Sequence, residues 1–382
     1  MLGIAIFLLS AGFVVYVVLG YPALLALAAR RAKRPVQKQP AERTVSILLP
    51  VRNGERWIRA KLESIYALDY PRELVEVIVV CDGCRDATAK VAAAFDAPNL
   101  HVLSIGPSGK AVALNVAMER ATGEILLFTD VRQQLAPDAL KELVACFSDP
   151  SVGVASGELI IRDGATHAES NVGLYWKYEK WIRGNLSRID SMLGATGAIY
   201  AMRRSLARPL APGTILDDVN LPLSAFFQGY RIVLDEAAKA YDEPAALHTE
   251  FRRKLRTLAG VYQSIGAFPA LLGPRNRMWL HFMSHKFGRL LLPWALIAMA
   301  AASFALPGAW RALALAAQAA FYGVAVLDTA MPERWPIKRL TSPVRTFVVL
   351  MIAAAGAVSI FFVPPRALWG ETRVRTEKQP PR

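Results

Sequence analysis

Residues 77–88 read VIVVCDGCRDAT, an apolar and β-branched run that ends in an aspartate and a glycine turn. The first four residues have the composition of a buried strand, and the alanine-rich stretch after the turn has that of a helix. A redox cysteine pair would open a helix, whereas Cys81 and Cys84 flank the end of a strand. A zinc site is also disfavoured, because no second cysteine pair or nearby histidine completes it. Asp82 is therefore the more informative residue, with a buried turn-forming aspartate as the alternative.

The same alternation continues along the chain between about Thr44 and Ala246. Strand-like runs such as VSILLP, LHVLSI and EILLFT are each followed by an amphipathic helical stretch. This order predicts an α/β domain built from βαβ units, with a mainly parallel sheet and helices on both faces. Such sheets bind ligands at the carboxyl ends of their strands, so the residues just after each strand are candidates. They are Asn53 and Glu55 after the first strand, Asp82 after the second, Lys110 after the third and Asp130 after the fourth.

The composition places this domain next to a membrane. The chain has 382 residues, of which 54% are hydrophobic, and a net charge of +14. No charged residue occurs from Leu2 to Ala29, and about 20 apolar residues are enough to span a bilayer. A cleaved signal peptide is the alternative, but no basic segment precedes the run and its apolar part is too long. Basic residues follow it directly, so we expect the domain in the cytoplasm, without structural disulfides.

Apolar runs return near the C-terminus, at 288–306, 312–327 and 344–363. Three spans after a cytoplasmic domain put the tail outside, whereas its basic residues favour the inside, so the side of the tail stays open. The predicted organisation is an N-terminal transmembrane helix (1–29), a basic linker (30–43), the α/β domain (44–250), amphipathic interface helices (251–287), about three C-terminal transmembrane helices (288–363) and a basic tail (364–382).

Five segments in a fixed order carry a family resemblance. They are PVRNGE, CDGCRDAT, SGKAVALN, ILLFTDV and LDDVN, and the likeness extends over about 45–263. This set resembles the membrane-bound family 2 glycosyltransferases, which include cellulose, hyaluronan and poly-N-acetylglucosamine synthases and smaller non-processive enzymes. The resemblance implies a Rossmann-like GT-A fold and inverting sugar transfer from a nucleotide-sugar donor, expected to be UDP-linked. It also implies a lipid-linked or saccharide acceptor at the cytoplasmic face of the inner membrane.

The resemblance assigns a donor pocket to the strand ends. Asn53, Glu55 and Asp82 would lie at the nucleotide, with the Asp82 carboxylate accepting a hydrogen bond from a uracil N–H. Lys110 follows a glycine at a predicted helix start, where a cation and free backbone N–H groups both favour a phosphate. A solvated lysine in the first helical turn is the alternative.

Asp130 would be the first carboxylate of the family's Asp-x-Asp metal clamp. Here the triplet is Asp130-Val131-Arg132, so a guanidinium replaces the second carboxylate. One interpretation keeps Mg²⁺ or Mn²⁺, bound by Asp130, donor phosphates and water, because Mg²⁺ often takes only one or two carboxylates. In the other, Arg132 itself offsets diphosphate charge. We prefer the first.

The segment GTILDDVN supplies the predicted catalytic base. By alignment with the family's Thr-Glu-Asp motif, Asp218 would take the proton of the acceptor hydroxyl. Asp217 occupies the position of the motif's glutamate and would lie beside the acceptor. An N-capping carboxylate is the alternative for one of the two. The stretch SMLGATGAIYAMRR, with Gly194 and Gly197, resembles the family segment that borders the acceptor sugar. The alternative is that these two glycines serve only packing or a turn.

The stretch HTEFRRKLRTLAG matches the family's Gln-x-x-Arg-Trp motif in part. Arg256 falls on its arginine, which would bind the donor diphosphate, while Arg253 replaces the glutamine and Thr257 the tryptophan. The tryptophan helps processive members hold their growing chain, so its absence favours single transfers. A basic juxtamembrane helix drawn to anionic membrane lipids is the alternative, and both roles are compatible.

The sequence leaves two other functions open. A processive exopolysaccharide synthase is the alternative enzyme. A polytopic transporter or lipid-binding protein with a regulatory domain would need charges inside its spans, yet the C-terminal runs carry only Arg289 and Arg345, each near an end. Nucleic-acid binding is disfavoured because much of the positive charge lies beside the spans. The sequence makes no prediction about protein partners.

Overall fold

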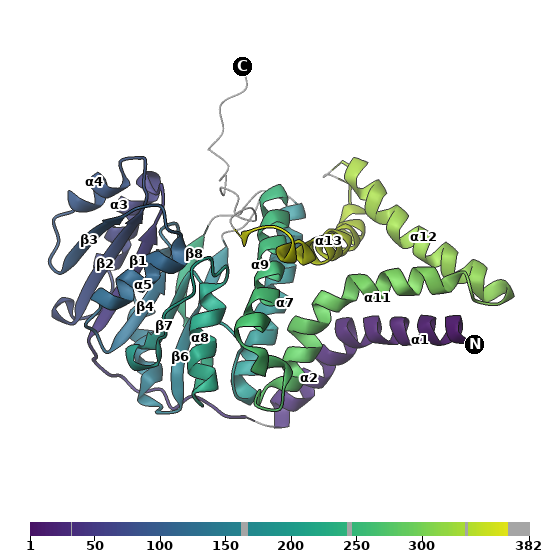
Figure 1. Cartoon of the computed structure of the whole chain (residues 1–382), viewed down its shortest axis with the longest axis horizontal. Helices are drawn as coiled ribbons and strands as arrows, with labels where there is room; N and C mark the ends of the chain where they lie inside the picture. The colour runs from purple at the N-terminus through teal and green to yellow at the C-terminus, as the bar shows by residue number, and fades with distance from the viewer. Residues whose placement is uncertain (32, 162–166, 243–246, 333–334, 366–382) are drawn as a thin grey trace, which may run out of the picture.

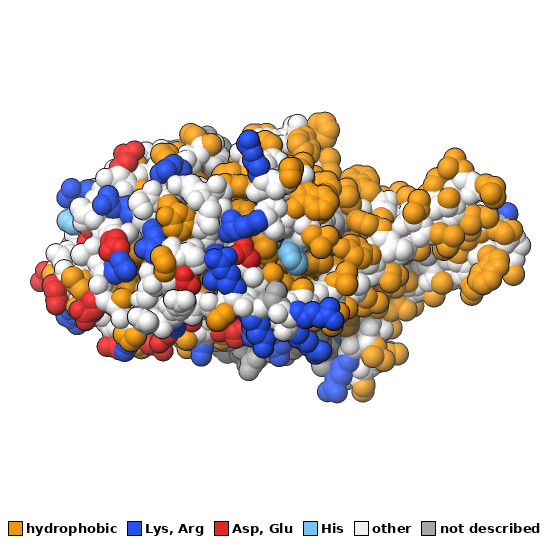
Figure 2. Space-filling model, turned by 90° about the horizontal axis from the view of Figure 1, so that it is seen from below, with side chains coloured by type: hydrophobic (Ala, Val, Ile, Leu, Met, Phe, Trp, Pro, Cys, Tyr) orange, Lys and Arg blue, Asp and Glu red, His pale blue; other side chains and the backbone are white. Residues whose placement is uncertain are grey.

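The computed structural model describes the chain except for residues 32, 162–166, 243–246, 333–334 and 366–382. A mixed α/β domain lies at one end, and a group of long helices projects from it (Figure 1). The space-filling view shows charged side chains over the domain and apolar side chains over the projecting helices (Figure 2). This division agrees with a domain that sits against a membrane.

The domain is built on one twisted sheet with the strand order β3-β2-β1-β4-β7-β6-β8-β5. Its strands are β1 (Val45–Val51), β2 (Val75–Asp82), β3 (Leu100–Ile105), β4 (Ile125–Thr129), β5 (Gln134–Leu135), β6 (Val152–Ile161), β7 (Ile199–Arg203) and β8 (Arg231–Asp242). The half that holds β1 to β4 is parallel, as predicted. In the other half β6 and β8 are parallel, whereas β7 runs antiparallel to both of its neighbours.

The direction of β7 matters for the site. Because β7 is antiparallel to β4, Ile199 at its start pairs with Thr129 at the end of β4. The loop that precedes β7 therefore reaches the same sheet edge as the residues that follow the parallel strands. This is where the sequence places its candidate residues.

Helices cover both faces of the sheet, as predicted. They are α3 (Glu55–Tyr66), α4 (Thr88–Ala93), α5 (Lys110–Arg120), α6 (Ala139–Ala145) and α8 (Asp217–Phe227), with short helical turns η2 (Arg72–Leu74), η3 (Cys146–Ser148) and η4 (Arg204–Leu206). Alternate residues of each strand point into two separate cores. Leu48 and Phe128 lie in the core with α5 and α8, whereas Ile47 and Leu127 lie in the core with α3 and α6.

The N-terminal helix is continuous from Leu2 to Arg31, in three parts called α1 (Leu2–Val15), the π-helical η1 (Tyr16–Gly20) and α2 (Tyr21–Arg31). The C-terminal helices are α11 (Gly288–Ser303), α12 (Gly308–Ala330), α13 (Lys338–Gly356) and η7 (Ala357–Phe361). Among the described residues, the helices Leu2–Arg31, Gly308–Ala330 and Lys338–Phe361 are long and apolar enough to cross a membrane. The 16-residue α11 is shorter and packs along α1.

Two long helices stand between the sheet and the projecting helices (Figure 1). They are α7 (His167–Ile189), which packs against α2 and α13, and α9 (Leu247–Ala267), which also packs against α13. The chain then passes through η5 (Pro269–Leu272), α10 (Trp279–His281) and the π-helical η6 (Phe282–Phe287) into α11. Side chains of α7, α9 and η6 therefore face both the domain and the projecting helices.

Candidate active site

One lysine joins two of the predicted aspartates. Lys110 is the first residue of α5, and its Nζ lies 2.8 Å from Asp130 Oδ1 and 3.1 Å from Asp217 Oδ2. Burial lowers the pKa of Lys110, but the charges of Asp130 and Asp217 outweigh this effect and hold the pKa above the ordinary lysine value. The ends of β4, α5 and α8 thus meet at one place, although the residues are far apart in sequence.

Asp218 is held by the loop that precedes β7. Its Oδ2 accepts a hydrogen bond from Gly197 N at 3.1 Å, and its backbone oxygen accepts one from Ala195 N at 2.7 Å. A Cβ at position 197 would lie 3.1 Å from the same Oδ2, so a glycine lets the loop approach the carboxylate. Gly194, with φ of +135°, turns the loop toward α8. The two predicted acceptor glycines therefore form one unit with Asp218.

The protonation of Asp218 is set by its surroundings. Burial raises the pKa of Asp218 to about 6, with a further rise from Asp217 and an opposing effect of Lys110. At neutral pH the carboxylate is ionised but more basic than an ordinary aspartate. This is the property that a general base needs, since proton transfer is most efficient when the pKa lies near the working pH.

Asp82 is buried at the end of β2 and binds the turn that precedes Lys110. Its carboxylate accepts hydrogen bonds from Ser108 N at 2.6 Å and from Gly109 N at 3.0 Å, while Arg52 lies 4.0 Å away. Gly109 has φ of +94°, a conformation that favours glycine. In this arrangement Asp82 fixes the turn that delivers Lys110 to Asp130. Its predicted contact with a nucleotide base stays a prediction.

Asn53 and Glu55 lie at the end of β1 and bind the neighbouring loop. Asn53 Oδ1 accepts a hydrogen bond from Arg85 N at 2.9 Å, and Glu55 Oε2 accepts one from Ala87 N at 3.0 Å. Asn53 adopts φ of +51°, which asparagine tolerates better than most residues. These two residues fasten the loops after β1 and β2 beside Asp82, and no hydrogen bond or ion pair among the described residues links them to Asp130 or Asp218 directly.

Lys61 is a buried lysine that belongs to none of the sequence motifs that carry the family resemblance. Only 1% of this residue is exposed, and its Nζ donates hydrogen bonds to Thr129 Oγ1 at 2.7 Å and to the Gln133 backbone oxygen at 2.5 Å. It thus ties both ends of the segment that carries Asp130. Burial lowers the pKa of Lys61 to about 7. The signal lay in helical spacing, because Lys61 shares the apolar face of α3 with Ile58 and Ile65.

Arg132 turns away from the carboxylates. Its Nη2 lies 2.5 Å from Asp242 Oδ2, which also accepts a hydrogen bond from Gln133 Nε2 at 2.8 Å. Within the described residues no three His, Cys, Asp or Glu side chains come together in a way that would hold a metal ion. Asp130, whose side chain is 39% exposed, fits a metal only as a single protein ligand that leaves the remaining positions to phosphate and water.

Arg256 and Arg253 lie on α9, the helix that packs against α13. Burial lowers the pKa of Arg256, while the charges of Asp130 and Asp218 act in the opposite direction, so the guanidinium lies within electrostatic reach of both. Thr257 Oγ1 donates to the Arg253 backbone oxygen at 2.8 Å, so the residue at the predicted tryptophan position is turned onto its own helix. The site is therefore lined by the sheet edge on one side and by α9 on the other.

Two family models match the part of the chain that carries these residues. A family model described as Glycosyl transferase family group 2 matches residues 130–355, more than half of the chain, and one described as Glycosyl transferase family 2 matches residues 46–210. The chain belongs to glycosyltransferase family 2. The family prediction is confirmed, and the matched ranges contain Lys110, Asp130, Asp218 and Arg256.

Curated proteins with glycosyltransferase names are moderately similar to this chain. An N-acetylglucosaminyltransferase of Rhizobium meliloti is 27% identical over 281 residues, which are 68% of this chain and 66% of that protein. A beta-monoglucosyldiacylglycerol synthase of Trichormus variabilis is 28% identical over 178 residues, or 45% of this chain and 36% of that one. The chain spans about half to two thirds of the length of the first curated relatives that it matches.

A solved structure confirms the fold. The mannosyltransferase PcManGT of Pyrobaculum calidifontis, determined with GDP-Man and Mn²⁺, superimposes with a TM-score of 0.70 at 24% identity. The match covers 94% of this chain and 98% of that one, so it includes helices outside the sheet domain. The predicted GT-A architecture with helices at both ends of the chain is therefore correct.

Proposed function

We propose that the protein is a membrane-bound inverting glycosyltransferase. It would transfer a sugar from a nucleotide donor, expected to be a UDP-sugar, to a lipid-linked or saccharide acceptor at the cytoplasmic face of the inner membrane. The observation that carries this proposal is the pairing of Lys110 with Asp130 and Asp217, next to Asp218 in the chain and within electrostatic reach of Arg256 on α9, a helix that packs against α13.

The chemistry follows from the charges of these groups. An acceptor hydroxyl would attack the anomeric carbon on the face opposite the diphosphate, and the bond from that carbon to the diphosphate oxygen would break. The hydroxyl proton would pass to the Asp218 carboxylate, whose raised pKa suits it to this task. The leaving diphosphate would gain negative charge, which Lys110 and Arg256 would offset. Attack from the opposite face inverts the anomeric centre.

A divalent metal is part of the proposal, in the form of Mg²⁺ or Mn²⁺. Asp130 would hold it together with the donor phosphates, and when bound it would offset charge on the diphosphate. The solved mannosyltransferase contains Mn²⁺, and that likeness supports a metal here. Arg132 contributes to the site indirectly in this proposal, because its guanidinium is paired with Asp242.

We further propose single transfers in place of chain growth. Thr257 stands where processive enzymes have a tryptophan, and its hydroxyl is bound to its own helix. The processive synthase remains the second candidate function, and product length separates the two. A relative named as a glycolipid synthase supports a lipid acceptor.

The test is a transfer assay with purified protein in detergent. It is supplied with a panel of UDP- and GDP-sugars and a membrane lipid extract, and the products are identified by mass spectrometry. We expect one donor to be consumed and one lipid class to gain the mass of one sugar. Asp218→Asn should abolish the gain, while Asp69→Asn, at an exposed aspartate outside the site, should not. Failure to consume any donor would refute the proposal, and a long polymer would replace single transfer with processive synthesis.

A further inference from the structure

The two segments that lead to the projecting helices meet at one carboxylate. Asp190 directly follows α7, and its Oδ1 lies 2.7 Å from Nη1 of Arg34, in the linker after α2. Its Oδ2 accepts a hydrogen bond at 2.5 Å from Nε of Arg277, which stands shortly before α10. Asp190 therefore bridges the segment that follows the N-terminal helix and the segment that leads into the C-terminal helices.

The helix that Asp190 follows does not explain this residue. A negative charge at the C-terminal end of a helix opposes the helix dipole, so the position disfavours a carboxylate unless other groups bind it. The side chain of Asp190 is 16% exposed, whereas those of Arg34 and Arg277 are 56% and 33% exposed. The carboxylate is thus the enclosed centre of the bridge, and its loss would leave two guanidinium groups without their common partner.

A buried arginine belongs to the same junction. Arg231, at the start of β8, is 1% exposed, and its guanidinium donates to the Asp190 backbone oxygen at 2.8 Å and to the Arg34 backbone oxygen at 2.6 Å. Arg34 N donates to the Arg188 backbone oxygen at 2.7 Å, and Asp149 lies 3.7 Å from Arg231. The junction gathers several guanidinium groups, so the charge of Asp190 offsets repulsion among them.

Both supports of the predicted base begin at this junction. Asp190 is the first residue of the loop that contains Gly197, whose N–H binds the Asp218 carboxylate. Arg277 holds the other end of α8, because its Nη1 donates to the Phe226 backbone oxygen at 2.9 Å and its guanidinium lies 3.9 Å from the centre of the Phe226 ring. One loop and one helix therefore link Asp218 to the segments that lead to the projecting helices.

The donor side of the site is held separately. Lys110 joins the start of α5 to Asp217 at the start of α8 and to Asp130 at the end of β4. These ion pairs lie within the sheet domain and do not involve Asp190. Loss of the junction should therefore keep the donor-side groups together while it loosens their placement relative to the projecting helices.

We propose that Asp190 is a positioning residue that sets the height of Asp218 above the membrane through its pairs with Arg34 and Arg277. This inference rests on the proposed function and adds the contact that keeps the base level with the hydroxyl of a membrane-embedded acceptor lipid. The bilayer fixes the depth of that hydroxyl, and a misplacement of about 1 Å between reacting groups can lower a rate about a hundredfold. Transfer to a membrane lipid should therefore depend on Asp190, whereas donor binding should not.

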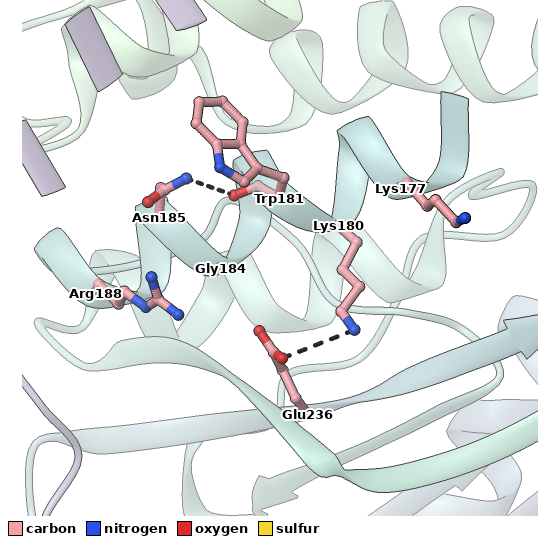
Figure 3. Close-up of a pocket in the computed structure, with 7 residues that line it drawn as sticks. All are labelled: Lys177, Lys180, Trp181, Gly184, Asn185, Arg188 and Glu236. Carbon is pink, nitrogen blue, oxygen red and sulfur yellow. Dashed lines mark hydrogen bonds and ion pairs between the residues drawn. The ribbon is translucent and has the colours of Figure 1, made fainter. Parts of the chain in front are cut away.

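The outer face of α7 provides a matched control. Lys180 lines a shallow pocket there, together with Trp181 and with Glu236 of β8 (Figure 3). The Lys180 Nζ lies 2.7 Å from Glu158 Oε1 and 3.7 Å from Glu236 Oε2, so these pairs tie α7 to β6 and β8. Lys180→Gln thus breaks ion pairs of the same helix and leaves the contacts of Asp190 in place.

The first experiment measures the junction and needs no turnover. Hydrogen exchange is followed by mass spectrometry in purified full-length protein in lipid nanodiscs. In Asp190→Asn we expect the backbone amides of Arg34 and Trp279 to exchange about tenfold faster, because each segment loses a hydrogen bond to a charged group. The amides of β4 should keep their rates in this variant, and Lys180→Gln should change none of these rates.

Two outcomes of the exchange experiment would overturn the proposal. Unchanged rates in Asp190→Asn would show that the carboxylate does not hold the two segments. An equal rise in β4, or in Lys180→Gln, would show a general loosening of the fold. Arg34→Gln, at the more exposed end of the bridge, is the second variant with the same expectation, so that poor folding of Asp190→Asn leaves this variant to decide.

The second experiment separates this inference from the proposed function. It uses the donor that wild type consumes in the panel assay. Transfer to a membrane lipid extract in nanodiscs is compared with hydrolysis of the donor in detergent without lipid, where water takes the sugar. We expect Asp190→Asn to lower kcat/KM for the lipid at least about tenfold, and to leave the donor KM and the hydrolysis rate within about twofold. Lys180→Gln should change none of these quantities.

The outcomes distinguish positioning from support of the fold. A joint fall of hydrolysis and lipid transfer would mean that Asp190 only stabilises the domain, and undiminished lipid transfer would mean that the site does not depend on it; either result overturns the proposal. If wild type neither transfers to lipid nor hydrolyses any donor, the proposed function fails, while the exchange rates still decide whether Asp190 holds the junction.

Discussion

Replacement of Asp218 by asparagine should stabilise the protein while it destroys activity. The carboxylate of Asp218 is ionised at neutral pH although burial and Asp217 oppose its charge, and its pKa is raised to about 6 from an ordinary value of 3.8. A shift of about 2 units corresponds to about 3 kcal/mol of unfavourable free energy in the folded state at neutral pH. Asparagine removes the charge and keeps an oxygen that can accept from Gly197 N.

The alternative role of Asp218 predicts the opposite sign. It lies in the first turn of α8, where a negative charge at a helix N-terminus stabilises by about 0.3–1 kcal/mol. If that were its main effect, asparagine would lower stability by that amount and leave activity intact. Because the burial effect is larger, we expect a net gain of about 2 kcal/mol in the free energy of unfolding at pH 8.

The pH dependence adds a second check. A carboxyl whose folded pKa is raised gains protons on folding, so its unfavourable contribution is absent below about pH 4 and grows as pH rises to about 6. The melting temperatures of wild type and Asp218→Asn, measured by tryptophan fluorescence in detergent, should therefore converge near pH 4 and separate at pH 8. Transfer should fall by about 10²- to 10⁴-fold in the variant. A less stable variant with normal turnover would refute this reasoning, and Asp69→Asn should change neither quantity.

Three further predictions follow from the same site. The kcat/KM of the wild type should rise with pH through about 6 and then level off, because the carboxylate of Asp218 must be ionised to accept a proton; a flat profile from pH 5 to 8 would contradict this. Lys61→Met should lower kcat and raise the donor KM, together more than tenfold in kcat/KM, because it releases Thr129 and Gln133 at both ends of the segment that carries Asp130. Its melting temperature should change little, since the loss of hydrogen bonds is offset by removal of a buried charge. Treatment with EDTA should abolish transfer and added Mn²⁺ should restore it; full activity in EDTA would show that Lys110 alone supplies the cation beside Asp130.

The half of the fold that rests on local patterns was predictable. The strands β1, β2 and β3 are apolar runs that are each followed directly by a helix, and β4 is followed by α6 after the short β5. This order fixes a parallel sheet with its ligand edge at the strand ends. The placement of Lys110 at the start of α5 and of Asp217 at the start of α8 followed from the same reading. In these cases neighbouring residues carry the information.

The rest depends on contacts between distant segments. The pairing of β7 joins it to residues of β4 that lie 70 to 78 positions away and to residues of β6 that lie 44 to 48 positions away, and no local pattern in Ile199–Arg203 specifies the partner or its direction. The same holds for Asp82, whose carboxylate binds the backbone of Ser108 and Gly109. Lys61 shows a different limit, because its position on an apolar helix face marks it as buried but does not reveal that it holds Thr129.

The charge balance of the site gives a reason why the proposed metal would need only one carboxylate in this chain. Asp130, Asp217 and Asp218 supply up to three negative charges, and Lys110 pairs with the first two but offsets only one of their charges. A donor diphosphate would bring further negative charge to this place, and Arg132 is not free to meet it because Asp242 holds its guanidinium. A cation that arrives with the donor, bound by Asp130 and the phosphates, would correct that imbalance and would leave Lys110 beside Asp217. The substitution at position 132 then makes metal binding dependent on the donor, so Mn²⁺ should bind weakly to the protein alone and tightly only with a nucleoside diphosphate present.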